Sequence, residues 1–378
     1  MKSAIHSFAR TPVAKAGRQL STFDAVALAS IAAKEALLRA GDLSGRISAA
    51  VFGTSRLAGQ GPNPARRFAL ESGLDESVPA FTVTSACCSA FDALVCASRM
   101  IALGEVDAVL VGAAESMTRT PKALLYSEAG ASDVEYEDLH LRDGLRCPLT
   151  GMLMAEIAEA LARSEGQTRV ECEEVALRSH RNYAAHRKLH EADIVAVETK
   201  DELLDSDPLV REEEVLARMP DLSPVFGRGG RLTPATICAV ADGGAAAVLV
   251  RADLAPAAPV IAAHTRTAGP PENACTAAVE ALKKLERTTG NSVSRAEHIE
   301  INEGFASQLL ATANALSIDP IRVNPFGGAL AIGHPTGMTP LRMTGLARRA
   351  ILEGAASAVL AVPVSGGIGF ALSMEAPK

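Results

Sequence analysis

The chain has 378 residues, 48% of them hydrophobic and only 3% aromatic, so it can bury one or two large cores closed by small and aliphatic side chains. Its formal net charge is −7 with no concentrated basic patch, which argues against nucleic acid and membrane surfaces as partners. The seven cysteines lack paired metal spacing, the N-terminus is too polar for a signal peptide, and no apolar run reaches the ~18 residues that span a bilayer, so we expect a soluble, cytoplasmic protein with free thiols.

Helical and strand-like patterns alternate in the first third of the chain. Residues 22–40 repeat apolar side chains at helical spacing, and residues 49–54 predict a short strand. Residues 89–103 predict a helix of small side chains stopped by Gly104. Residues 106–112 then form an apolar run typical of a strand buried in a parallel sheet.

The pattern changes over residues 116–222, which carry more charge and lose this alternation. A plain connection of that length is improbable in a compact domain, so an inserted loop domain is predicted there. Residues 1–115 and 223–250 are expected to form an N-terminal half, and residues 251–378 a C-terminal half. The later predicted elements are strands at 245–250, 298–302 and 356–362 and helices at 273–287 and 341–352.

The two halves share a repeated pattern around Gly104 and Gly354, each of which follows a predicted helix and precedes a similar apolar strand. Seventeen residues before these glycines lie Cys87 and Gly337, and His334 stands just before the latter. Two similar halves that face each other predict an active site at their shared interface.

Cys87 stands at the predicted start of a helix, where the helix dipole and free backbone N–H groups favour a thiolate. The same N–H groups can hold an oxyanion once the thiolate attacks a carbonyl. Alternatively, Cys87 and Cys88 are two small buried residues of an alanine-rich helix. Cys88 points about 100° away from its neighbour on a helix and is expected to be buried packing.

Three further blocks carry candidate chemistry. Glycines surround His334 in NPFGGALAIGHPTG (residues 324–337) and allow a ligand to approach the backbone closely. Asn302 follows a strand in INEGFA (301–306), where it can hold a water or the histidine, or donate to an oxyanion. The segment SGGIG (365–369) predicts a backbone nest of N–H donors. Taken alone, each block also has a simpler structural interpretation: His334 can be a buried core histidine, and the other two blocks can be ordinary turns.

Together these blocks resemble the thiolase family over nearly the whole chain. Segments ARTPV (9–13), GQGPNPAR (59–66), GAAESM (112–117) and DGGAAA (242–247) are similar to characteristic family segments, and the Asn-Glu-x-Phe and Gly-His-Pro-x-Gly blocks are the most specific. The resemblance implies an α/β, five-layered αβαβα fold of two similar halves with an inserted loop domain. It also implies a homodimer or homotetramer and an acyl-CoA or acyl-carrier thioester as substrate, with no further cofactor.

The resemblance also implies roles for individual residues. Cys87 matches the nucleophile, His334 the histidine that activates it, and Asn302 the asparagine that positions a catalytic water. Backbone N–H groups of Cys87, Ser365 and Gly366 would hold a thioester oxygen. The residues expected to face the substrate are Phe305, Cys238, Ala239 and Met152.

One departure from the family pattern concerns a second cysteine, which in thiolases moves the proton of the α-carbon. Pro363 occupies the matching position, and no cysteine occurs after Cys275. Proline has no acid or base to offer. We therefore expect acyl transfer through Cys87. The alternatives are a decarboxylating condensing enzyme that uses only the Cys–His–Asn set, and a non-catalytic subunit with this fold.

No metal site is expected. His186 and His190 are four residues apart, but Arg181, Arg187 and Lys188 surround them, so a solvated helix face is the favoured interpretation.

Overall fold

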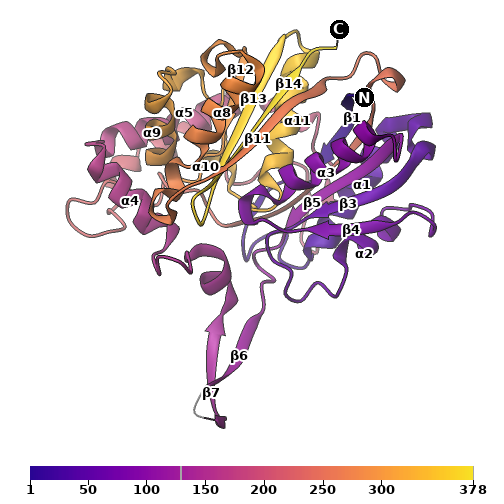
Figure 1. The fold of residues 1–378 in the computed structure, drawn as a ribbon. Coiled ribbons are helices and arrows are strands. Elements are labelled where there is room, and N and C mark those ends of the chain that lie inside the picture. The colour runs from indigo at the N-terminus through magenta and orange to yellow at the C-terminus, as the bar shows by residue number, and fades with distance from the viewer. Residues whose placement is uncertain (128–129, 378) are drawn as a thin grey trace.

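The computed structural model describes residues 1–127 and 130–377 (Figure 1). Its principal strands follow the order β12-β13-β14-β11-β1-β10-β5-β3-β4, and the two halves of this arrangement meet at a single paired position, Ala4 with Val260. The N-terminal half holds β1 (Ser3–Arg10), β2 (Ala14–Lys15), β3 (Ile47–Gly53), β4 (Ala80–Val83), β5 (Ala108–Glu115) and β10 (Ala241–Arg251). The C-terminal half holds β11 (Val260–Ala268), β12 (His298–Ile301), β13 (Ser357–Val364) and β14 (Ile368–Glu375).

The predicted internal repeat is confirmed by the topology. Helix α3 (Ser89–Leu103) precedes β5 in the first half, and α11 (Thr339–Leu352) precedes β13 in the second. β5 runs parallel to β3 and antiparallel to β10, while β13 runs parallel to β12 and antiparallel to β14. The two halves therefore place equivalent loops before α3 and α11.

Helices cover both faces of each sheet. Helices α3 and α11 lie between the two sheets, α1 (Ala25–Ala40) and α2 (Pro64–Glu71) cover the outer face of the N-terminal sheet, and α8 (Ala278–Thr289) and α9 (Ala306–Ala315) lie on the other side of the C-terminal one (Figure 1). The period-2 alternation of β5 explains how one strand serves two cores: Val109 and Val111 face the central layer, whereas Ala108 and Leu110 face α1. Gly244 lets α1 pack directly against β10, because a Cβ there would collide with the backbone of Leu28.

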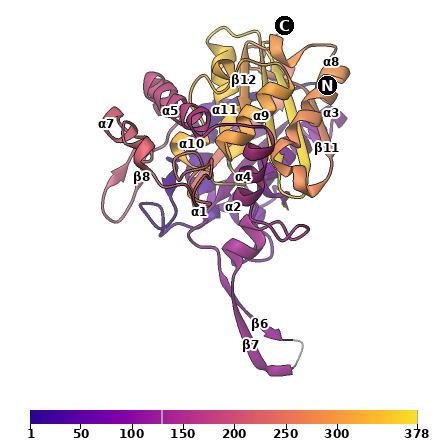
Figure 2. The same cartoon turned by 90° about the vertical axis from the view of Figure 1, so that its left-hand side faces the viewer.

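The middle of the chain contains more regular structure than its sequence pattern indicates. A hairpin of β6 (Lys122–Ser127) and β7 (Gly130–Asp138) projects away from the body in both views (Figures 1 and 2). A π-helical turn (Leu141–Leu145) leads to α4 (Met154–Ser164) and α5 (Arg169–Ala185), which pack on α9. The remaining short elements are α6 (Arg187–Glu191), β8 (Val197–Glu198), β9 (Leu203–Leu204), α7 (Glu213–Leu216) and α10 (Ala329–Ile332).

Two predictions about this fold are wrong in detail. The helix expected from residue 273 begins at Ala278, because Pro271 opens a kinked 3₁₀ segment (Pro271–Thr276) ahead of it. His190 is fully buried rather than part of a solvated face: its ring stacks on Tyr183, and its Nε2 lies 2.7 Å from the Phe326 carbonyl oxygen. Among the described residues no cluster of three potential metal ligands occurs.

Helix α3 with its preceding turn (Ala86–Leu103) is long and apolar enough, by length and composition, to cross a membrane. It packs between the two sheets, however, which is the position of a core helix.

Candidate active site

Cys87 lies in a 3₁₀ turn (Ala86–Cys88) between β4 and α3, two residues before Ser89, the first residue of the helix at whose start it is expected. Ala86 has a positive φ of 51°, an uncommon conformation for a residue with a Cβ. The Ser89 hydroxyl stabilises this turn, since it donates to the Ala86 carbonyl oxygen at 2.7 Å and accepts from the Ser85 N–H at 3.0 Å. Cys88 is fully buried, as predicted. The turn packs against β13 and α11, so Cys87 faces the C-terminal half.

His334 enters from that half, in the loop before α11. Its backbone N–H donates to the Ala239 carbonyl oxygen at 2.9 Å. Its Nδ1 lies 2.7 Å from the Thr339 hydroxyl, which itself donates to the Pro335 carbonyl oxygen at 3.0 Å. Because the Thr339 proton is thus engaged, the hydroxyl accepts from Nδ1–H, and Nε2 carries the lone pair of the ring.

Asn302 lies beside this lone pair, with its Nδ2 3.4 Å from Nε2 of His334. Its backbone is fixed at the end of β12 by hydrogen bonds to Ala361 (3.0 Å) and from Gln308 (2.6 Å). The Asn302 Oδ1 atom is buried and has no partner among the residues described. A buried amide oxygen without a partner costs free energy, so this position favours a water or a substrate group as donor.

Glu303 links the Asn-Glu block to the glycine-rich block around His334. Its buried carboxylate accepts from Ser179 (2.7 Å), Asn324 (2.8 Å) and the Leu330 N–H (3.1 Å). Gly328 leaves room for it, since a Cβ there would collide with the carboxylate. The adjacency of Asn302 and His334 therefore depends on a buried scaffold that the two blocks build together.

The glycine-rich segment 365–369 forms the tip of the β13–β14 hairpin. Gly366 and Gly367 have positive φ angles of 82° and 79°, a conformation that glycine adopts at little cost, and they allow the tight turn from β13 to β14. Gly367 also has to approach the backbone of Gly269 and Pro270 closely, because a Cβ would collide with their carbonyl oxygens. Pro363 pairs with Gly369 in the hairpin and offers no proton-transfer group.

Two buried charged residues near Cys87 carried no role in the sequence analysis. Glu115 ends β5 and accepts from the Ser55 N–H (3.0 Å) and the Gly337 N–H (2.9 Å), which ties the N-terminal half to the loop that bears His334. Arg56 donates to the Thr336 hydroxyl at 2.8 Å and lies 4.0 Å from Glu115. Only the long-range contacts of the folded chain reveal these roles.

The electrostatics of the site correct one expectation. Burial raises the pKa of the Cys87 thiol to about 11, and the Arg56 guanidinium only partly offsets this effect. Burial, together with the charges of Arg342 and Arg56, lowers the pKa of His334 to about 3. The position before α3 thus does not produce a thiolate in the free protein. Cys87 and His334 form a neutral thiol and a neutral imidazole near pH 7.

The residues expected to face the substrate fall into two groups. Cys238 and Phe305 are on adjoining segments, since the Cys238 N–H donates to the Gly304 carbonyl oxygen at 3.1 Å and Ile237 bridges Phe305. Burial and then the charge of Cys87 raise the pKa of the Cys238 thiol to about 12, which places Cys238 near Cys87. Met152 instead lies on the turn after the π-helix, where its carbonyl oxygen accepts from the Cys147 N–H at 2.8 Å.

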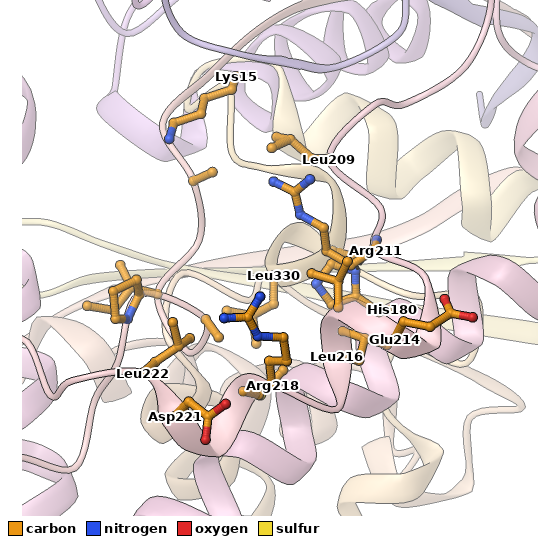
Figure 3. Close-up of a pocket in the computed structure, with 17 residues that line it drawn as sticks. Lys15, His180, Leu209, Arg211, Glu214, Leu216, Arg218, Asp221, Leu222 and Leu330 are labelled. Atoms are coloured by element: carbon orange, nitrogen blue, oxygen red, sulfur yellow. Dashed lines mark hydrogen bonds between the residues drawn. The ribbon is translucent and has the colours of Figure 1, made fainter.

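A cavity of about 720 Å³ opens beside these segments. Ile237, Ala239, Leu330 and Ala331 form its apolar part next to Cys238 and to the His334 loop. The polar side carries the cations Lys15, Arg211 and Arg218 together with His180, Glu214 and Asp221. Figure 3 shows the two guanidinium groups pointing into the space between the labelled side chains. The Ala239 carbonyl oxygen accepts a hydrogen bond from the His334 N–H, so Ala239 connects the cavity to His334.

Comparisons with known proteins identify relatives of this chain and solved structures of similar fold. Residues 3–253 match the thiolase N-terminal domain, and residues 255–376 match the thiolase C-terminal domain. A probable acetyl-CoA acetyltransferase of Mycobacterium leprae is 35% identical with 99% of each chain covered, and the acetyl-CoA acetyltransferase of Cupriavidus necator is 32% identical with 98% of each covered. A thiolase from Ascaris suum, solved in complex with coenzyme A, is 27% identical and has a TM-score of 0.92 over 100% of both chains. An acetyl-CoA acetyltransferase from Syntrophomonas wolfei is 29% identical and reaches 0.93 over 99% of this chain and 98% of its own.

Proposed function

This chain belongs to the thiolase family, and the relatives it resembles are acyltransferases with the same α/β fold. We propose that it transfers an acyl group from an acyl-CoA thioester through an acyl-enzyme on Cys87. The arrangement of His334 is the observation that carries this proposal. Thr339 fixes Nδ1 as the protonated nitrogen, so Nε2 is the ring nitrogen that can accept a proton.

The chemistry begins with a neutral pair. As the Cys87 sulfur attacks the thioester carbonyl, its proton passes to Nε2 of His334. The high pKa of the thiol therefore keeps Cys87 protonated before the attack but does not prevent the attack. N–H groups of Cys87, Ser365 and Gly366 supply donors for the oxygen of the tetrahedral intermediate. The departing coenzyme A thiolate takes the proton from His334, and the acyl group stays on Cys87.

The cavity in Figure 3 suits the coenzyme A portion of the substrate. Arg211, Arg218 and Lys15 supply positive charge for phosphate groups, and the apolar side next to Cys238 suits the pantetheine arm. The thioester would then lie between Cys87 and His334. This polarity along the cavity favours a coenzyme A thioester over a small free acid.

The proposal is tested by intact-protein mass spectrometry after mixing with acetyl-CoA or acetoacetyl-CoA. An acyl adduct is expected on the native protein and on a Cys96→Ala control, and no adduct on Cys87→Ala. An adduct that persists in Cys87→Ala would refute Cys87 as the nucleophile. A native protein that never acquires an adduct would favour a non-catalytic subunit.

A second candidate is a condensing enzyme that forms its carbanion by loss of CO2, and the observation that favours it is Pro363. Without a proton carrier on β13, a β-carboxylated extender would generate the nucleophile with no second thiol. Release of CO2 from a malonyl thioester on the acylated enzyme would support it. Carbon–carbon products from acetyl donors alone would rule it out.

A further inference from the structure

Proton transfer from the Cys87 thiol to Nε2 of His334 requires a fixed separation between two loops that belong to different halves of the fold. One short segment at the end of β3, residues 53–56, contacts both loops. The Glu115 carboxylate binds this segment and the histidine loop together. We propose that Glu115 is a positioning residue that sets the separation between Cys87 and His334. This inference rests on the proposed acyl transfer through Cys87.

The first contact of the segment is with the turn that carries Cys87. The Ser89 hydroxyl, which donates to the Ala86 carbonyl oxygen, also lies 3.1 Å from the Thr54 carbonyl oxygen and can share its proton with it. Gly53 brings β3 against the start of α3, because a Cβ there would lie 2.7 Å from the Ser89 carbonyl oxygen. The segment therefore meets the cysteine turn backbone to backbone, with no flexible side chain between them.

The second contact of the segment is with the loop that carries His334. The Gly337 N–H and the Thr336 hydroxyl donate to Glu115 at 2.9 Å and 3.1 Å, and the hydroxyl oxygens of Ser55 and Thr336 are 2.6 Å apart. A Cβ at Gly337 would lie 2.8 Å from both the Glu115 Oε2 atom and the Ser55 nitrogen. A glycine at this position thus lets the histidine loop lie directly against the carboxylate and the segment.

The Glu115 carboxylate is fully buried and bonded on both sides. Its donors are the N–H groups of Ser55 and Gly337 and the hydroxyls of Thr54, Ser55 and Thr336. An ionised carboxylate only accepts hydrogen bonds, and its two oxygens offer about four sites for them. The Arg56 guanidinium, 4.0 Å away, provides the opposite charge. A neutral amide in the same place would offer one oxygen and turn its own donors against these donors.

The charge of Glu115 affects Cys87 in the direction opposite to its positioning role. Burial is the main cause of the raised pKa of the Cys87 thiol, the Glu115 charge adds to it, and Arg56 opposes it. Removal of this charge should therefore ease ionisation of Cys87 and accelerate its alkylation. Acylation should instead become slower, because His334 no longer lies at the correct separation. These opposite changes distinguish a positioning role from a general loss of reactivity.

The test compares native protein with Glu115→Gln and with a control, Glu353→Gln, since Glu353 is exposed at the end of α11. Single-turnover release of coenzyme A measures acylation, and peptide mapping after iodoacetamide at about pH 8 measures alkylation of Cys87. Glu115→Gln should acylate about 10²-fold more slowly, yet its Cys87 should be alkylated at least as fast as in native protein. The control should match native protein in both. Cys88 is fully buried and should stay unmodified in every folded variant.

Two further variants change the histidine side of the contact and leave the Glu115 charge in place. Gly337→Ala inserts a Cβ between the carboxylate and the histidine loop, so acylation should slow while alkylation of Cys87 stays within about twofold of native. Thr336→Val removes the hydroxyl that donates to Glu115 and accepts from Arg56, and should slow acylation by roughly 10-fold. If alkylation of Cys88 shows that Glu115→Gln is unfolded, Gly337→Ala decides the question.

A native acylation rate in folded Glu115→Gln, or in Gly337→Ala, would overturn this role. So would an equal fall of acylation and of Cys87 alkylation in a folded variant, because that result shows a less reactive cysteine rather than a displaced histidine. Absence of acylation in the native protein is a different result, since it contradicts the proposed function itself.

Discussion

The Nδ1 atom of His334 lies 2.7 Å from the hydroxyl of Thr339, five residues along the chain at the first turn of α11. The Thr339 proton is used by the Pro335 carbonyl oxygen, so the hydroxyl accepts a hydrogen bond from the imidazole. A single threonine thereby sets the tautomer of the histidine and aims the lone pair of Nε2 toward Asn302 and the interface between the halves.

Loss of this hydrogen bond should weaken the histidine as a base. Thr339→Val leaves a buried Nδ1–H without an acceptor, at a cost of about 1–3 kcal/mol, so acylation of Cys87 should slow by roughly 10-fold or more. His334→Ala should slow it by about 10²–10⁴-fold. Single-turnover release of coenzyme A measures both rates. Equal rates in native protein and Thr339→Val would contradict the assigned tautomer.

The reactivity of Cys87 should depend strongly on pH. Its pKa is raised to about 11, so the thiolate fraction grows with each pH unit and alkylation by iodoacetamide should still be accelerating at about pH 10. Arg56 offsets part of the burial effect, and Arg56→Met should move the inflection to higher pH. The exposed Arg142→Met serves as control. A plateau in the native rate near pH 7 would contradict the neutral thiol.

Basic residues of the cavity should matter only for substrates that carry the nucleotide. Arg211→Ala and Arg218→Ala should raise KM for acetyl-CoA, because each removes a positive charge from the side proposed for the phosphates. The acetyl thioester of N-acetylcysteamine has no phosphate, so kcat/KM for it should not change. Steady-state kinetics with both substrates separate the two effects. An equal loss of kcat/KM with both substrates would show that these arginines do not act by binding the phosphates.

Buried histidines should make the fold sensitive to acid. Burial lowers the pKa of His334 and His190 to about 3 and that of His180 to about 4, whereas an unfolded histidine titrates near 6.5. Between these values the unfolded chain binds more protons, so stability is complete above about pH 6.5 and falls as pH drops toward 3–4. Each histidine contributes a slope of about 1 kcal/mol per pH unit.

Urea unfolding at a series of pH values measures this slope. His190→Gln removes one of the three groups and should flatten the acid side of the profile. An unchanged slope would show that His190 is not buried as a neutral group.

The sequence predicts regular elements well where the pattern is periodic and local. The helix at residues 89–103 matches α3, and the repeat around Gly104 and Gly354 matches two equivalent positions in the topology. The prediction fails at His190, because the charged residues around it in the sequence suggest an exposed helix face. The stacking of its ring on Tyr183 becomes visible only in the folded chain.

The site is only partly readable from its motifs. Glycine-rich and Asn-Glu blocks indicate His334 and Asn302, which the fold brings to 3.4 Å from each other. Arg56 and Glu115 carry no local signal, since their contacts are with residues far away along the chain. The expectation of a stabilised Cys87 thiolate was wrong because burial outweighs the backbone dipoles before α3.

The most direct test of the central claim is rapid-mixing measurement of free coenzyme A after the protein meets an acyl-CoA. An acyl-enzyme on Cys87 predicts a burst of about one equivalent of coenzyme A per chain, absent in Cys87→Ala and slowed in His334→Ala. Peptide mapping of the quenched sample should place the acyl group on Cys87. A burst of the same size in Cys87→Ala, or an acyl group mapped to another residue, would contradict the account.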